Sequence, residues 1–189
     1  MVSLSAAASA NFARPPMKTV SVIRSFRVAQ EKRVAVYAEF DRRLRGMIPS
    51  RSFSQYPAAC SAATSSFSEI SADARAAIAV LGEAGVEAAA AARHAQQVQT
   101  LEAEKLTLTA ALHLDMIRRQ KLLPTEENSE EEADGEEDDD FEAAAQRQDI
   151  ALIDQSLAQL QDKLKAIVES INENLEGLAS EMAELADSE

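Results

Sequence analysis

The sequence predicts an all-α protein, built as an antiparallel bundle or coiled coil of about four long helices. Apolar residues recur at steps of three or four along most of the chain, which places them on one side of a helix. Only five glycines and five prolines interrupt the 189 residues, and most of them fall between the periodic segments. The alanine-rich composition favours helix over sheet. Long helices joined by short connections indicate an up-down-up-down topology.

The first helix is expected over about residues 17–45, after a disordered tail over residues 1–16. Gly46 is predicted to take the left-handed position that commonly ends a helix. Basic residues in the last turn are favoured by the helix dipole. Two polar residues interrupt the predicted apolar stripe, which consists of Ile23, Phe26, Gln30, Arg33, Tyr37, Phe40, Leu44 and Met47.

Two further helices complete a three-helix segment over residues 17–123. Pro57 suits the first turn of the second helix, because a proline nitrogen has no hydrogen to leave unpaired there. Gly82 and Gly85 bracket a tight connection, and Pro124 ends the third helix. The seam of the third helix is interrupted by a histidine and a lysine, and consists of Ala91, His94, Val98, Leu101, Lys105, Leu108 and Leu112.

The last helix, expected over residues 143–187, has the best-defined apolar seam in the chain. No polar residue interrupts this series, so the helix is predicted to pack against the same bundle. At a length of about 65 Å it is longer than its predicted partners. One end could therefore project or pair with a second chain, as in a homo-oligomer. The seam consists of Ile150, Ile153, Leu157, Leu160, Leu164, Ile167, Ile171, Leu175, Leu178, Met182 and Leu185.

A linker over residues 124–142 is predicted to be disordered. Its segment Glu126–Glu142 holds 12 acidic and no basic residues, and such like charges repel one another. Ser129 precedes three glutamates and is a candidate site for an acid-directed kinase. Alternatively, the segment could mimic nucleic acid and bind basic proteins such as histones. A calcium loop centred on Gly135 fails, because Phe141 stands where a bidentate carboxylate is needed.

Charge divides between the two ends of the chain. Arg14–Arg51 sum to +7 and Ala143–Glu189 to −7, within a net charge of −13. The basic end suggests contacts with a protein partner or with phosphates. Mutual pairing with the acidic last helix is the simpler account, and no aromatic residue accompanies the arginines to stack on bases. The candidate contact residues are Arg42, Arg43, Arg45 and Arg51.

The sequence predicts neither an enzyme nor a cofactor or metal site. His94 and His113 lie 19 residues apart on one helix, so they point about 100° apart and cannot readily share a metal. Cys60 is the only cysteine, which fits a reducing compartment. No apolar run is long enough to span a membrane. The Ser- and Ala-rich tail leaves organelle targeting open as an alternative to disorder.

Several segments resemble the Required-for-Excision B-type family of DNA repair proteins. The strongest similarity lies in the third helix, from His94 through Leu106 and again from Ala111 to Leu114. The similarity extends over about Val20 to Leu185, and the acidic insert before a heptad-patterned last helix agrees with the family layout. Further matching positions are Ile23, Gln30, Arg33, Tyr37, Leu44, Tyr56, Cys60 and Phe67.

The resemblance implies a non-enzymatic role in DNA excision repair, in the nucleus, through contacts with the repair machinery. It brings no catalytic residues. The alternative is a coiled-coil scaffold of cytoskeletal or ciliary assemblies, which would work in the cytoplasm without contacting DNA.

Overall fold

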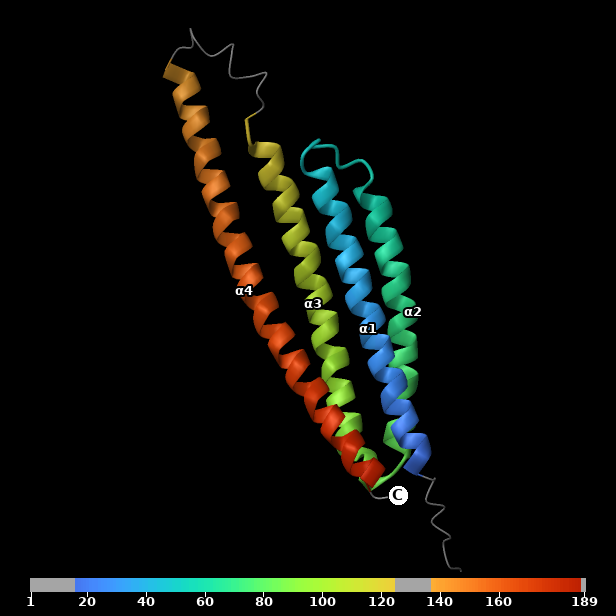
Figure 1. The fold of residues 1–189 in the computed structure, drawn as a ribbon. Helices are drawn as coiled ribbons and strands as arrows, with labels where there is room; N and C mark the ends of the chain where they lie inside the picture. The colour runs from blue at the N-terminus through green and yellow to red at the C-terminus, as the bar shows by residue number, and fades with distance from the viewer. Residues whose placement is uncertain (1–15, 125–136, 188–189) are drawn as a thin grey trace, which may run out of the picture.

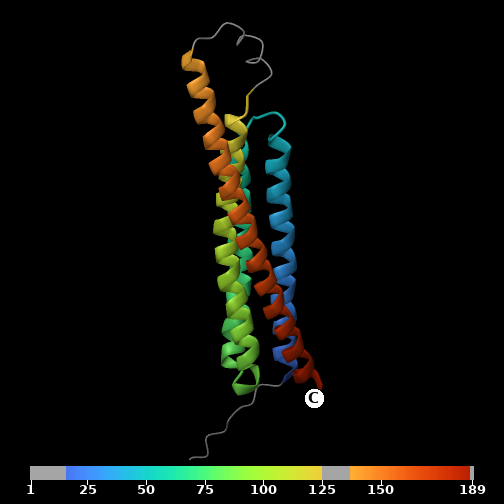
Figure 2. The same cartoon turned by 90° about the vertical axis from the view of Figure 1, so that its left-hand side faces the viewer.

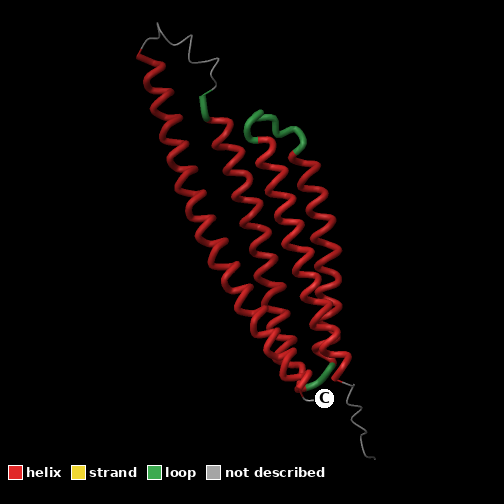
Figure 3. Tube along the Cα trace, viewed as in Figure 1, coloured by secondary structure: helices red, strands yellow, loops and turns green. Residues whose placement is uncertain are grey.

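Four long helices make up almost all of the structure (Figure 1), a computed structural model that describes residues 16–124 and 137–187. The described residues contain no strand, and short turns and loops join α1 to α2 and α2 to α3 (Figure 3). The prediction of an all-α bundle is therefore confirmed. In chain order the helices are α1 (Pro16–Met47), α2 (Tyr56–Glu83), the short 3-10 helix η1 (Val86–Ala88), α3 (Ala89–Leu122) and α4 (Glu137–Asp187).

The helices alternate in direction and pack as two pairs. The α1–α2 pair and the α3–α4 pair have the most extensive contacts, while α2 meets α3 and α1 meets α4 over shorter stretches. Figure 2 shows why the last contact is short: α4 lies beside α3 at its amino-terminal end and crosses obliquely towards α1 at its carboxyl end. The α1–α2 hairpin and the α3–α4 hairpin are therefore in closest contact near the carboxyl end of α4.

The end of α1 differs from the prediction at Gly46. The helix continues through Gly46 to Met47, and the positive φ lies instead at Arg51, at 50°. A left-handed backbone is strained for a residue with a side chain. Here Arg51 donates hydrogen bonds to the carbonyl oxygens of Leu123 and Pro124, at 2.7 and 2.8 Å. These bonds tie the α1–α2 connection to the end of α3 and hold the turn in place.

The connections around α2 and α3 follow most of the predicted signals, but Gly82 lies inside α2 and does not open the connection. Pro57 lies in the first turn of α2. Gly85, with a φ of 96°, makes the turn into η1, where a residue with a Cβ atom would be strained. Leu123 is extended after α3, as expected for the residue before a proline.

The predicted seam of α4 faces the rest of the bundle, but its residues are buried to different degrees. Ile167, Ile171, Leu178 and Leu185 are buried, and the other seven seam residues are partly buried. All four buried residues lie in the carboxyl-terminal half of α4, where the helix crosses towards α1 (Figure 2). The helix begins at Glu137 rather than near residue 143. A helix start tolerates acidic residues because the dipole favours them there, so acidity did not mark the boundary.

The core consists of two apolar clusters separated along the bundle axis. The first joins all four helices and includes Ile23, Phe26, Leu81, Val98 and Leu178. The second lies nearer the α1–α2 turn, around Phe40, Ala59, Ala63 and Phe67. Three buried polar residues, Gln30, Arg33 and Glu102, lie between the two clusters, and we call them, with the side chains that they contact, the polar layer.

Candidate functional site

The residue at the centre of this polar layer is Arg33 of α1, whose surface is only 2% exposed. Its guanidinium donates hydrogen bonds to Gln30 Oε1 at 3.1 Å, Ser71 Oγ at 3.0 Å and Gln99 Oε1 at 2.9 Å. These partners come from α1, α2 and α3 respectively. Burial lowers the pKa of Arg33, and the nearby carboxylate of Glu102 opposes that shift. One arginine therefore joins three helices.

Glu102 of α3 supplies the buried negative charge of the layer. Its Oε1 lies 3.4 Å from the ammonium of Lys105, and that ammonium lies 4.0 Å from the centroid of the Tyr37 ring. The Tyr37 hydroxyl donates to the backbone carbonyl of Glu102 at 3.4 Å. Burial, together with the Glu102 charge, raises the pKa of Tyr37. The layer thus contains two cations, one anion and an aromatic ring.

Two atoms of the polar layer lack a hydrogen-bond partner among the described residues: Gln30 Nε2 and Glu102 Oε2. Because buried polar atoms without partners are costly, the layer adds less stability than an apolar core would. Its geometry instead favours one register of α1, α2 and α3. Sequence analysis found Gln30, Arg33 and Lys105 only as interruptions, since a single-helix pattern does not show which interruptions meet.

His113 of α3 is a third buried titratable group, after Arg33 and Glu102. It is 1% exposed, its ring centroid lies 4.5 Å from that of Phe40 and 6.1 Å from that of Tyr56, and its Nε2 lies 3.9 Å from Asp41 Oδ1. Its Nδ1 has no hydrogen-bond partner among the described residues. Burial lowers the pKa of His113 despite the Asp41 carboxylate. The histidine is therefore held neutral within an aromatic cluster.

The lowered pKa of His113 makes stability depend on pH. In the unfolded chain His113 has a pKa of about 6.5, so below this pH it binds a proton there, whereas in the folded chain it stays neutral down to a lower pH. The free energy of unfolding is therefore unaffected by this histidine above pH 6.5, and it falls as the pH decreases from 6.5 towards the pKa of His113 in the folded chain. We expect His113→Gln to reduce the loss of unfolding free energy between pH 7.5 and 5.5 by up to about 1 kcal/mol.

Urea unfolding at the two pH values measures this difference. The matched control is His94→Gln, at the other, partly exposed histidine. An equal effect of the two substitutions would show that burial of His113 is not the cause.

His94 has a structural role beside α4. Its Nδ1 lies 3.1 Å from Asn174 Oδ1. A Cβ atom at Gly177 would lie only 2.6 Å from His94 Cε1, so glycine allows the two helices to approach here. The described residues contain no group of three or more potential metal ligands, and the two histidines do not meet.

Three of the four arginines predicted to contact a partner lie exposed at the end of α1. Arg42 and Arg43 both pair with Glu39, at 2.8 and 2.7 Å, and Arg45 pairs with Asp41 at 2.8 Å. Hydrogen bonds from Arg43 and Arg42 lower the pKa of Glu39. The acids that pair with these arginines thus come from α1 itself and not, as the charge division suggested, from α4.

Arg51, the fourth predicted contact residue, has the separate structural role described above. An ion pair between α3 and α4 joins Arg119 to Asp154 at 2.6 Å. Ser129, the candidate phosphorylation site, lies outside the described residues. So does most of the acidic segment, and the predicted linker is not tested further.

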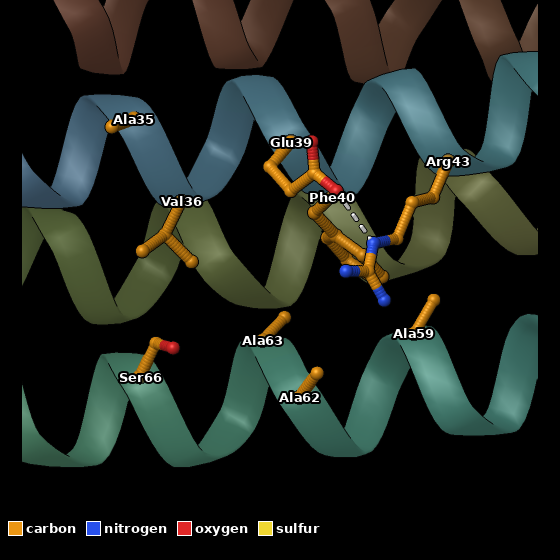
Figure 4. A pocket seen from close by; sticks show the side chains of 9 residues that line it. All are labelled: Ala35, Val36, Glu39, Phe40, Arg43, Ala59, Ala62, Ala63 and Ser66. Carbon is orange, nitrogen blue, oxygen red and sulfur yellow. Dashed lines mark hydrogen bonds and ion pairs between the residues drawn. The ribbon is translucent and has the colours of Figure 1, made fainter.

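An open groove follows the outer side of the α1–α2 hairpin. Three cavities of about 540, 250 and 440 Å³ succeed one another along it, and we call them together the outer groove. Figure 4 shows its middle part, where Ala59, Ala62 and Ala63 of α2 face α1 and Arg43 reaches over from α1. Sequence analysis missed this surface, because it predicted buried faces and not the space between neighbouring exposed ones.

The outer groove and the basic end of α1 are open to solvent, whereas Gln30, Arg33 and Glu102 are buried within the bundle. No described helix is both long and apolar enough to cross a membrane.

Comparison with known proteins identifies the family. Neither the curated proteins nor the solved structures gave a match. The family model "DNA repair REX1-B" matches residues 21–116, which is just over half of the chain. The matched part contains most of α1, all of α2 and most of α3, so the polar layer, His113 and the outer groove all lie within it. The match is shorter than the similarity noted in the sequence, because α4 lies outside it. The chain belongs to the DNA repair REX1-B family.

Proposed function

We propose that the protein is a non-enzymatic accessory factor of DNA excision repair, which acts in the nucleus through protein contacts. Family membership over residues 21–116 is the observation that carries the repair role. The contact mechanism is supported by the fold, in which the buried polar residues bond to one another across helices and the exposed residues form grooves and charged ends.

The basic end of α1 is the surface that we assign to a repair partner. The Arg42 and Arg45 side chains are 73% and 71% exposed. Two arginines share the single carboxylate of Glu39, so one positive charge is left over there. An acidic protein surface would complement this end, and its arginines are well suited to bidentate pairing with carboxylates.

Removal of ultraviolet photoproducts from cellular DNA tests the repair role. Cells that lack the gene should remove photoproducts more slowly than the parent, and the wild-type chain should restore the rate. A variant with Arg42, Arg43 and Arg45 all changed to Ala should fold but restore the rate poorly. The matched control changes Arg27, Arg93 and Arg118, three exposed arginines elsewhere. An unchanged removal rate in the deleted cells would refute the proposal.

Direct binding of DNA is the competing mechanism for the same arginines. If they contact protein, purified wild type and the triple variant should both bind DNA negligibly near physiological salt. If they contact phosphates, wild-type affinity should fall steeply with salt, and the triple change should flatten that slope by up to about three units. Fluorescence anisotropy with a damaged duplex over a salt series measures this. We expect the first result, because no stacking aromatics accompany the arginines.

A further inference from the structure

The outer groove combines a floor of small side chains with two rims of different charge. Val28, on the α1 side, is 47% exposed. With small side chains at the contact, a second pair of helices can approach the groove closely. The small residues that line it include Ala35 of α1 and Ala58, Ala62, Ser66 and Ala76 of α2.

The α1 rim is basic. Arg24 and Lys32 line the largest cavity, and Arg42 and Arg43 line the cavity nearest the α1–α2 turn. Glu39 is the one acid that lines the α1 side of these cavities. This rim therefore carries an excess of positive charge.

The α2 rim is acidic. Asp73 lines the largest cavity, and Glu69, one turn earlier, shares its helix face. Lys32 and Asp73 line the same cavity from opposite sides, and among the described residues neither forms a hydrogen bond or an ion pair. A lysine and an aspartate thus lie at one level of the groove, and neither pairs with another residue that the structure describes.

We propose that a second copy of this chain occupies the outer groove, related to the first by a two-fold axis parallel to the helices. This axis places α1 of each copy over α2 of the other at the same level. Lys32 of each copy then faces Asp73 of the other, so the contact forms twice. A two-fold axis across the helices would instead place α1 on α1 and oppose like charges. This inference goes beyond the proposed function. The two surfaces share Arg42 and Arg43, which line the groove, whereas Arg45 lies outside it.

The size of the groove suits a stable dimer. From Val22 to Gly46 it extends about 36 Å along α1, and two neighbouring helices are about 20 Å wide. The face therefore measures roughly 700 Å² per copy, close to the 800 Å² or so that each partner buries in a standard interface. The α4 seam, in contrast, already faces the other helices of its own chain, so the outer groove is the better surface for self-association.

Sedimentation velocity on the full-length protein tests the dimer. We expect wild type at about 100 µM to sediment mainly as a dimer. Ala62→Arg places a long side chain on the exposed floor of the groove and should raise the dissociation constant at least about tenfold. Ala103→Arg makes the same change at an exposed position on α3, away from the groove, and should leave the dimer intact. Circular dichroism checks that both variants fold.

A charge exchange tests the proposed register. Lys32→Glu alone places a new carboxylate opposite Asp73 at both contacts of the dimer. Asp73→Lys alone places a new ammonium opposite Lys32 at both contacts, so each variant should sediment as a monomer. An equimolar mixture of the two variants should form dimers again, because each contact then joins a carboxylate to an ammonium. An electrostatic role within one chain would not respond to mixing.

Three results would overturn the proposal. One is a wild-type chain that stays monomeric at about 100 µM, as expected if the groove receives a different protein. The second is a dimer that Ala62→Arg leaves unchanged, since it would use another face. The third is a dimer that Ala62→Arg abolishes but whose single charge variants do not recover on mixing. Repair activity is scored separately, so failure of the dimer leaves the proposed function standing.

Discussion

Arg33→Ala should destabilise the protein by about 3 kcal/mol or more. The substitution removes all three hydrogen bonds of the guanidinium and leaves Ser71 and Gln99 without this partner. It also removes a buried cation near the carboxylate of Glu102, whose Oε2 already lacks a hydrogen-bond partner among the described residues. Thermal unfolding followed by circular dichroism measures the loss.

Arg93→Ala is the matched control for this prediction. Arg93 is exposed on α3, so its removal should change the unfolding free energy by no more than about 0.5 kcal/mol. If the two variants melted alike, the polar layer would not contribute to stability. A double variant, Arg33→Met with Glu102→Gln, should lose less unfolding free energy than Arg33→Ala. The second substitution removes the buried negative charge that Arg33 would otherwise balance.

Leu178→Asp should unfold the bundle or come close to it. Leu178 is completely buried in the cluster that joins all four helices. The change removes a buried apolar side chain, at about 3 kcal/mol or more, and buries a carboxylate. The two effects together use up most or all of an unfolding free energy of about 5–15 kcal/mol, which is typical of a folded domain. Loss of helical circular dichroism at 25 °C, or a strongly lowered melting temperature, checks this prediction.

Two further variants on α4 test whether the cost of a buried carboxylate depends on how deeply the substituted residue is buried. Leu152→Asp, at a position 57% exposed on the same helix, should leave the melting temperature almost unchanged. Leu160→Asp, at a partly buried seam position nearer the amino end of α4, should cost several kcal/mol but less than Leu178→Asp. Equal costs at Leu160 and Leu178 would contradict the graded burial of the seam.

The helices and the seam of α4 could be predicted from the sequence, because both follow from local periodicity. Each of the eleven seam residues is buried or partly buried in the structure. Pro57, Gly85 and Pro124 mark helix boundaries for reasons that lie in the backbone itself. Gly46 misled the prediction, since a glycine is also tolerated inside a helix when the turn is fixed elsewhere, here at Arg51.

The contact surfaces and the polar layer could not be predicted in the same way. Periodicity shows only that Arg33 and Lys105 interrupt the apolar stripes of their own helices. The hydrogen bond between Arg33 and Gln99 depends on the register of α1 against α3, which periodicity does not give. The net charges of whole segments also suggested the wrong ion-pair partners for the arginines at the end of α1. Glu39 is three or four residues from Arg42 and Arg43, and so pairs with them more readily than the distant acids of α4.

Photo-cross-linking from the basic end of α1 tests most directly whether the protein works through protein contacts. A photoreactive amino acid replaces Arg45, and the same replacement at the exposed Arg118 of α3 serves as control. Cells are irradiated to damage their DNA, and the cross-linker is then activated at a longer wavelength. The account predicts damage-dependent adducts with protein from position 45 that are absent from position 118. Adducts with DNA, and none with protein, would contradict it.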